Sequence, residues 1–191
     1  MWSHDHNLGF YQLGKPSEVP FLGFAPGVDW AIQTKDNSRL RNIMSSRNTT
    51  TGASFEEIVG ASLKRSCKAN ALTATAQVNI GEKPDGGNHI VDWQLTSNSK
   101  RSKKKVLVSC KFQSVSGTAQ DKVTYEVVKL ATAMKNDPSI THSFIVLGGK
   151  GWSSGMKDFV TTDLVADWFP KFEDKITICD IDSFMATLIN V

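Results

Sequence analysis

The chain has 191 residues, of which 40% are hydrophobic and 21% charged, and its formal net charge is +3. These values exclude a globally disordered chain and fit a single domain that buries a core without disulfide bonds. The three cysteines show neither a disulfide pattern nor zinc-ligand spacing, and we find no apolar run of membrane-spanning length and no signal peptide, so we expect a cytoplasmic protein without membrane partners.

The first 50 residues are rich in glycine, proline and aromatic side chains without a clear period. This composition predicts an irregular arm, with a short helix at 38–47, that packs on a domain formed by residues 51–191. Ser54 and Glu57 match a capping box, so we expect the first helix of that domain to begin there and to end near Asn70.

Three strands are expected next, at 73–80, 89–96 and 105–113. Because the links between them are short and either polar or rich in glycine, an antiparallel meander is the simplest topology. The remaining elements are expected to be a helix at 118–135, a strand at 142–147, a helix at 158–169, a strand at 175–180 and a helix at 182–189. This order predicts the α/β class, with a mixed central β-sheet flanked by helices.

The link between the second and third strands carries much of the positive charge. Residues 1–111 hold 15 basic and 9 acidic side chains, whereas residues 112–191 hold 7 and 10. Five of the cations lie in the six residues from Lys100 to Lys105. Such a cluster indicates either a polyanion-binding surface or an ordinary solvated turn, and composition alone does not decide between them.

The third strand carries polar side chains on a face that is usually apolar in a central strand. With a period of two, Leu107, Ser109, Lys111 and Gln113 share one face, and a lysine there is costly unless it has a partner. The second strand contains Asp92, although aspartate is depleted in strands. If these two strands pair, Asp92 lies beside Ser109 or Lys111, either as a structural ion pair or as part of a site.

Three segments, Gly52–Glu57, His89–Trp93 and Val106–Gln113, together resemble the PD-(D/E)XK nuclease superfamily, best known from type II restriction endonucleases. The resemblance covers about residues 54–181. It implies an αβββαβ core and Mg²⁺-dependent hydrolysis of phosphodiester bonds in double-stranded DNA. It also implies a homodimer, because cutting both strands of a palindrome requires two symmetric sites.

The chain departs from the family at Ser109, where an acid normally stands two residues before the lysine. Some members supply the missing acid from the following helix, and Glu126 lies at a matching position, 15 residues after Lys111. Asp121 and the amide oxygen of Gln113 are the alternatives. Glu126 could instead form an exposed helical pair with Lys122, four residues earlier.

The remaining site residues follow from the resemblance. Glu57 is assigned to the capping box, so Glu56 is the expected carboxylate on the first helix. The expected Mg²⁺ ligands are Asp92, Glu126, Glu56 and the main-chain carbonyl near Cys110, because hard divalent cations prefer oxygen. Lys111 should remain protonated and act on the phosphate by electrostatics and positioning.

The same reasoning gives expected DNA contacts. These are Lys100, Arg101, Lys103, Lys104, Lys105, Gln113, Ser116, Thr118 and Lys122. Two function classes remain open: a metal-dependent endonuclease of the restriction, phage, homing or repair type, and a DNA-binding or assembly module that kept the fold and lost the chemistry. Ser109 is the best evidence for the second class.

Overall fold

The computed structural model describes residues 52–69, 72–97, 103–115 and 119–189. Its elements are α2 (Gly52–Ala69), β1 (Leu72–Glu82), β2 (Asn88–Ser97), β3 (Lys105–Phe112), α3 (Ala119–Asn136), β4 (Ile140–Gly148), α4 (Ser154–Asp158), the π-helix η1 (Phe159–Asp163), α5 (Leu164–Trp168), the 3₁₀-helix η2 (Pro170–Phe172), β5 (Ile176–Asp180) and α6 (Ile181–Ile189). The predicted arm and its helix at 38–47 lie outside the described residues.

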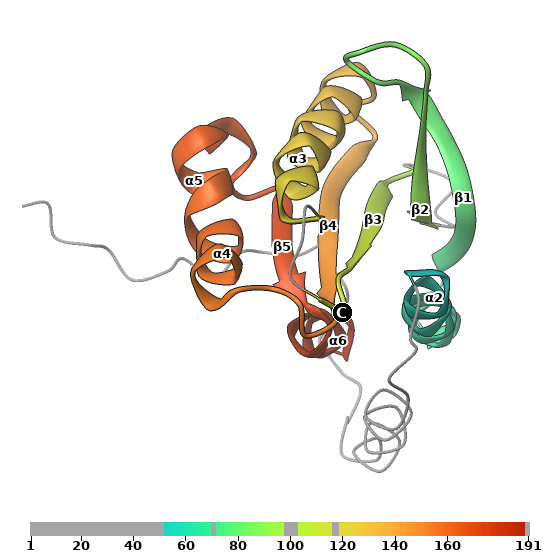
Figure 1. Ribbon diagram of the computed structural model, residues 1–191. Helices are drawn as coiled ribbons and strands as arrows, with labels where there is room; N and C mark the ends of the chain where they lie inside the picture. Colours follow the sequence, from blue (N-terminus) through green and yellow to red (C-terminus); the bar gives the residue numbers. More distant parts are fainter. Residues whose placement is uncertain (1–51, 70–71, 98–102, 116–118, 190–191) are drawn as a thin grey trace, which may run out of the picture.

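A five-stranded mixed sheet with the order β1-β2-β3-β4-β5 forms the centre of the domain (Figure 1). The first three strands form an antiparallel meander, whereas β3, β4 and β5 run parallel. The predicted fold class and meander are therefore confirmed. The interior of β3 and most of β4 are buried on both faces, as expected for parallel strands covered by helices.

Helices cover both faces of this sheet and separate two apolar clusters. On one side, α2 presents Phe55, Val59 and Leu63, which are fully buried at a spacing of four residues, and α6 packs beside it (Figure 1). On the other side, α3 packs on the sheet through residues such as Val127 and Leu130. The part of the chain described contains no helix that is both long and apolar enough to cross a membrane.

The predicted capping box at Ser54 is wrong. The helix already includes Gly52, so Ser54 lies within its first turn and not before it. Gly52 and Ala53 are exposed, and a glycine costs a helix only about 1 kcal/mol relative to alanine, so neither residue stops the helix from starting earlier. The reason given for preferring Glu56 over Glu57 therefore does not hold.

The helix predicted at 158–169 begins four residues earlier and is irregular. Residues 154–168 are helical throughout, but Phe159–Asp163 form a π-helical turn. In this region Thr161 and Thr162 donate side-chain hydrogen bonds to the carbonyl oxygens of Lys157 and Asp158, at 2.9 and 2.6 Å. These bonds compete with the regular backbone ladder, which gives a physical reason for the wider turn.

The contact between α2 and β2 gives a test of the packing. At Gly60 a Cβ atom would lie 2.0 Å from Cζ2 of Trp93. We expect Gly60→Ala to destabilise the domain by about 1–3 kcal/mol, because this overlap outweighs the gain in helix propensity of about 1 kcal/mol. Urea denaturation measures the difference.

Gly52→Ala is the matched control, since it lies in the same helix and a Cβ atom there has nothing within 4 Å. We expect it to leave the stability unchanged or to raise it slightly. A Gly60→Ala variant as stable as Gly52→Ala would show that Trp93 does not pack on α2 as described.

Candidate active site

Asp92 lies where β2 and β3 separate. The ladder between these strands begins at Thr96↔Lys105 and its last pair is Trp93↔Val108. Asp92, the next residue along β2, has no partner in this ladder. Beyond it, Oδ2 of Asp92 accepts a hydrogen bond from the backbone N–H of Cys110 at 2.6 Å and one from Oγ of Ser109 at 3.4 Å. The prediction that Asp92 lies beside Ser109 is confirmed, and both bonds on Oδ2 leave Oδ1 as the oxygen suited to a cation.

Lys111 is held by two partners at the end of β3. Its Nζ donates to Oγ of Ser109 at 2.7 Å and lies 3.0 Å from Oε2 of Glu126. Ser109 is therefore both a donor to Asp92 and an acceptor from Lys111, which a hydroxyl can be and an ionised carboxylate cannot. These contacts link Asp92, Ser109, Lys111 and Glu126 in one chain.

Glu126 points from α3 toward the sheet and is buried, with 5% of its side chain exposed. Its Oε2 also lies 2.7 Å from Nζ of Lys129, and its Oε1 lies 3.7 Å from Nε2 of the buried His89. Burial alone would raise the pKa of Glu126, but His89, Lys111 and Lys129 together lower it well below its ordinary value. The alternative of an exposed pair with Lys122 is wrong, because the face of α3 that carries Glu126 is turned toward Lys111.

Glu56 reaches the same end of the sheet from α2, whereas Glu57 is exposed. Burial raises the pKa of Glu56, the nearby Asp92 raises it further, and Lys111 lowers it. Glu56 also accepts a hydrogen bond from Nε2 of Gln77 at 3.4 Å. The structure therefore favours Glu56 over Glu57 by position, for a reason different from the predicted capping box.

These acids fit a hard divalent cation. Asp92 lies close enough to Glu56 for its charge to raise the pKa of Glu56, and a cation between the two carboxylates would relieve that repulsion. Mg²⁺ is commonly held by one or two carboxylates while water and substrate oxygens complete its coordination. Within the described ranges, no group of three or more His, Cys, Asp or Glu side chains could hold a metal ion, so a cation here would depend on such a two-carboxylate set.

Cys110 cannot contribute a thiolate in this environment. Its side chain belongs to the apolar cluster under α2, and burial, Asp92 and Glu56 all raise the pKa of the thiol far above its ordinary value. The predicted ligand was its main-chain carbonyl, and that assignment stays a prediction.

The described lysines that precede and begin β3 are not beside these residues. Lys103 and Lys104 are exposed, and Lys105 pairs with Asp137 at the end of α3, at 2.8 Å. Lys105 begins β3 and Lys111 lies near its end, which places them about 20 Å apart along the strand. Lys100, Arg101, Ser116 and Thr118 lie outside the described residues.

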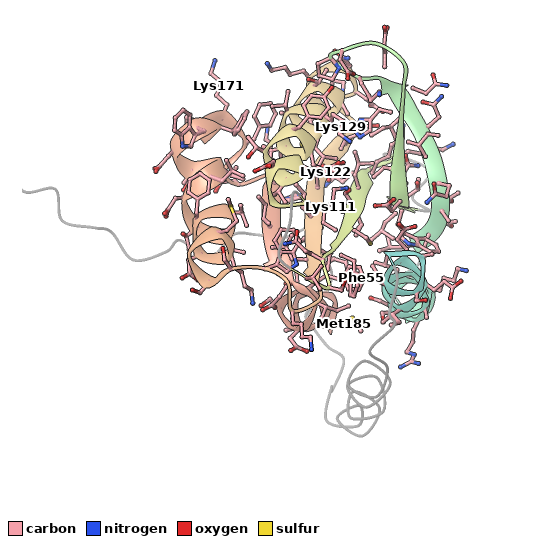
Figure 2. The ribbon with its side chains drawn as sticks, in the orientation of Figure 1. Phe55, Lys111, Lys122, Lys129, Lys171 and Met185 are labelled. Atoms are coloured by element: carbon pink, nitrogen blue, oxygen red, sulfur yellow. The ribbon has the colours of Figure 1, made fainter. Side chains whose placement is uncertain are left out.

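The other predicted positions are more dispersed. Gln113 is buried just after β3 and donates through Nε2 to the carbonyl of Gly151 at 2.8 Å, which ties β3 to the loop after β4. Asp121 and Lys122 are exposed near the start of α3. Figure 2 labels Lys122 and Lys129, which lie on α3, and Lys111, which lies on β3.

Three residues of the site were missed from the sequence. Gln77 has a φ of 51°, which is uncommon outside glycine, and its register places it opposite Asp92. His89 and Lys129 contact Glu126 from β2 and α3. Only His89 carried a signal in the sequence, as a polar residue at a strand end.

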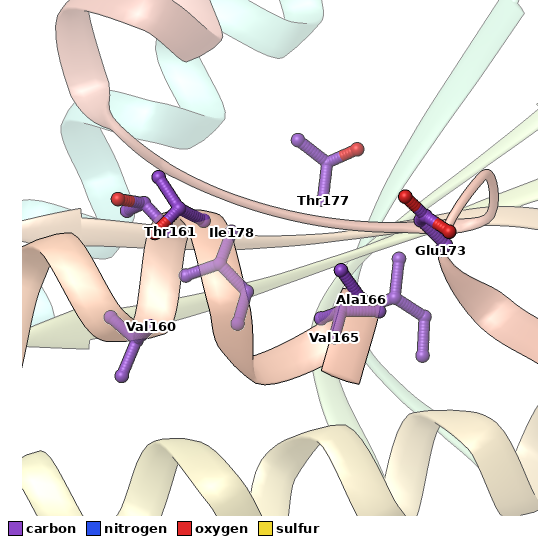
Figure 3. A pocket seen from close by; sticks show the side chains of 9 residues that line it. Val160, Thr161, Val165, Ala166, Glu173, Thr177 and Ile178 are labelled. Atoms are coloured by element: carbon purple, nitrogen blue, oxygen red, sulfur yellow. The ribbon is translucent and has the colours of Figure 1, made fainter. Parts of the chain in front are cut away.

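A small pocket of about 160 Å³ lies elsewhere, between η1, α5 and β5 (Figure 3). Val160, Val165, Ala166 and Ile178 line it together with several threonines, and Glu173 is its only titratable side chain. None of the residues around Asp92 contributes to it. The acidic cluster where β2 and β3 separate is therefore the stronger candidate for chemistry.

Comparison with known families supports the same conclusion. The family model of a PD-(D/E)XK nuclease superfamily domain matches residues 45–191. A search of curated proteins and a search of solved structures each found no significant match. The match includes every described element.

The coupling between Asp92 and Glu56 gives a second test. We expect Asp92→Asn to lower the pKa of Glu56, because it removes a negative neighbour, and Lys111→Met to raise it, because it removes a positive one. The pKa is measured by NMR titration of the side-chain carboxyl carbons, with Glu56→Gln assigning the signal. A pKa that stays fixed in both variants would contradict the arrangement.

Proposed function

Because the chain belongs to the PD-(D/E)XK nuclease superfamily, we propose that it is a metal-dependent DNA endonuclease that cuts duplex DNA, in the manner of a type II restriction enzyme. The observation that carries this proposal is the convergence of Asp92, Glu56, Lys111 and Glu126 where β2 and β3 separate. These residues come from four different elements.

Hydrolysis of a phosphodiester requires an activated water and compensation of the negative charge that grows on the phosphate. We propose that Asp92 and Glu56, with the carbonyl of Cys110, hold Mg²⁺. The ion would supply Lewis-acid stabilisation of the phosphate and lower the pKa of a water. The side chains of the site would then orient the phosphate and the attacking water.

Lys111 is proposed to act by charge and position. Its ammonium group donates to Ser109 and pairs with the ionised Glu126. A protonated lysine cannot abstract a proton, but its N–H groups can donate to a phosphate oxygen or orient the attacking water.

Glu126 is proposed to compensate for the acid that is missing at Ser109. It was predicted as a Mg²⁺ ligand, and the contacts support a different first role, since Oε2 is engaged by both Lys111 and Lys129. Its carboxylate would thus supply the negative charge that fixes Lys111, while Asp92 and Glu56 face the ion.

A homodimer acting on double-stranded DNA is the proposed functional form. Cutting both strands at a palindromic sequence calls for two copies of the site related by two-fold symmetry. The alternative, a DNA-binding module without chemistry, is favoured by Ser109 alone. It is opposed by the charged partners that surround Lys111, which are costly to bury for binding alone.

Cleavage of DNA tests the proposed function. We expect discrete fragments from phage DNA of known sequence in the presence of Mg²⁺ and none with EDTA. Asp92→Asn and Lys111→Met should lower the cleavage rate by about 100-fold or more, because each removes charge stabilisation at the reacting phosphate. Fragment sizes on a gel and the sequence of the cut ends measure both effects.

Gly52→Ala is the control variant, and it should cut like the unaltered protein. DNA that is retarded on a native gel but stays intact with Mg²⁺ would support the binding module. Full activity in Asp92→Asn would contradict the whole assignment of the site.

The exposed Lys103 and Lys104 are proposed to contact the DNA backbone away from the cut. A duplex positioned at Asp92 and running along β3 spans about 20 Å in roughly six base pairs. Lys105 contributes less charge, because Asp137 neutralises it. The turn would therefore contribute to affinity for longer duplexes and not to the chemical step.

Salt dependence tests this contact. We expect the double variant Lys103→Gln, Lys104→Gln to reduce the slope of log affinity against log salt by up to about 2, since each phosphate contact adds roughly 0.9. The control is Lys135→Gln, Lys171→Gln, which removes the same charge from exposed positions outside the proposed contact; Figure 2 shows Lys171 far from Lys111. Equal slopes in the two double variants would remove the turn from the interface.

A further inference from the structure

Lys129 occupies an unusual position for a helix lysine. It lies three residues after Glu126 on α3, its side chain is only 17% exposed, and its Nζ is 2.7 Å from Oε2 of Glu126. The same oxygen lies 3.0 Å from Nζ of Lys111. Two cations from different elements therefore converge on one buried carboxylate oxygen.

The charges explain why this oxygen needs both lysines. Glu126 is almost completely buried, so an uncompensated negative charge there would be strongly unfavourable. Lys111 alone must also remain available to Ser109 and to a phosphate. Lys129 places a second ammonium group on the same oxygen, and it would compensate the carboxylate when Lys111 moves toward substrate.

The geometry around Lys129 fixes its direction. Its ammonium group lies 5.7 Å from the ring centroid of Tyr125, so the aromatic face covers one side of the cation. Tyr125 in turn hydrogen-bonds Asp85 in the β1–β2 hairpin. On the other side of the carboxylate, His89 of β2 approaches Oε1 at 3.7 Å. The carboxylate is thus enclosed between α3 and β2 and is turned toward β3.

We propose that Lys129 is a positioning residue: it holds the ionised Glu126 against β3, and Glu126 in turn places the ammonium group of Lys111. This inference rests on the proposed nuclease function. Lys129 does not touch the ion or the DNA in this scheme, so it acts on the rate of the chemical step and not on the binding of Mg²⁺ or of substrate.

The test compares Lys129→Met with Lys129→Arg. We expect Lys129→Met to lower kcat by about 10- to 100-fold, in the range seen when a residue that orients a site group is removed. KM for a short cognate duplex and the Mg²⁺ affinity measured by calorimetry should stay within about threefold. Lys129→Arg, which keeps the charge, should recover most of kcat.

Coupling to Glu126 separates positioning from general stability. In the Glu126→Gln background, Lys129→Met should have little further effect on kcat, because the group through which it acts is already neutral. Lys135→Met is the control on the same helix; Lys135 is exposed, and its change should leave kcat intact in both backgrounds.

Three results would overturn the inference. They are an unchanged kcat in Lys129→Met, an equal loss of kcat in both backgrounds, and a fall in Mg²⁺ affinity as large as that caused by Asp92→Asn. Failure of the unaltered protein to cut DNA would instead refute the proposed function. In that case NMR titration of Glu126 still tests the contact, since Lys129→Met should raise the pKa of that carboxyl and Lys135→Met should not.

Discussion

The need to neutralise a lysine on a central β-strand shapes this end of the molecule. Lys111 lies on β3, which has strands on both sides and helices over both faces. Its ammonium group is only partly exposed, so it must be compensated by groups that the fold brings to it. Ser109 offers a hydroxyl from the same strand, and Glu126 offers a charge from α3. Removing Glu126 would leave a costly, poorly compensated charge, so the proposed chemistry and the local packing depend on the same contacts.

The sheet topology explains how these partners meet. The antiparallel meander changes to parallel pairing at β3, and α3 forms the crossover from β3 to β4. A crossover helix packs back over the strand that precedes it, so a side chain in its second turn can face the end of β3. The separation of β2 from β3 next to Trp93 then leaves the Cys110 N–H without a ladder partner, and Asp92 accepts it. The candidate site therefore lies where the β2–β3 pairing ends, close to the end of β3 and to the crossover helix α3.

Much of this arrangement could be predicted from the sequence, and the remainder shows where such reasoning stops. The period of two along β3 and the short link to β2 predict that Asp92 lies beside Ser109, because pairing register follows from local geometry. The spacing of Glu126 from Lys111 along the sequence could predict its place in the site. Its contact with Lys129 could not be predicted, because the face that α3 turns to the sheet depends on packing. Nothing in the side chain of Gln77 signals its positive φ, because glycine is the residue that usually adopts this conformation. The sequence does not show on its own how far Lys103 and Lys104 lie from Asp92, whereas the length of β3 places these two lysines at the end of the strand opposite Lys111.

Ser109 is better understood as part of a balanced charge cluster than as a lost acid. Asp92, Glu56 and Glu126 face Lys111 and Lys129, so the described cluster carries one net negative charge. An acid at position 109 would add a second negative charge where Oγ now lies 3.4 Å from Asp92, and an ionised carboxylate there could not donate a hydrogen bond. With the acid on α3, the charge is shared by two lysines, and Ser109 connects Asp92 to Lys111 through a single hydroxyl. Under the proposed function, the acid can thus stand on a different element, with Lys129 beside it as a second cation.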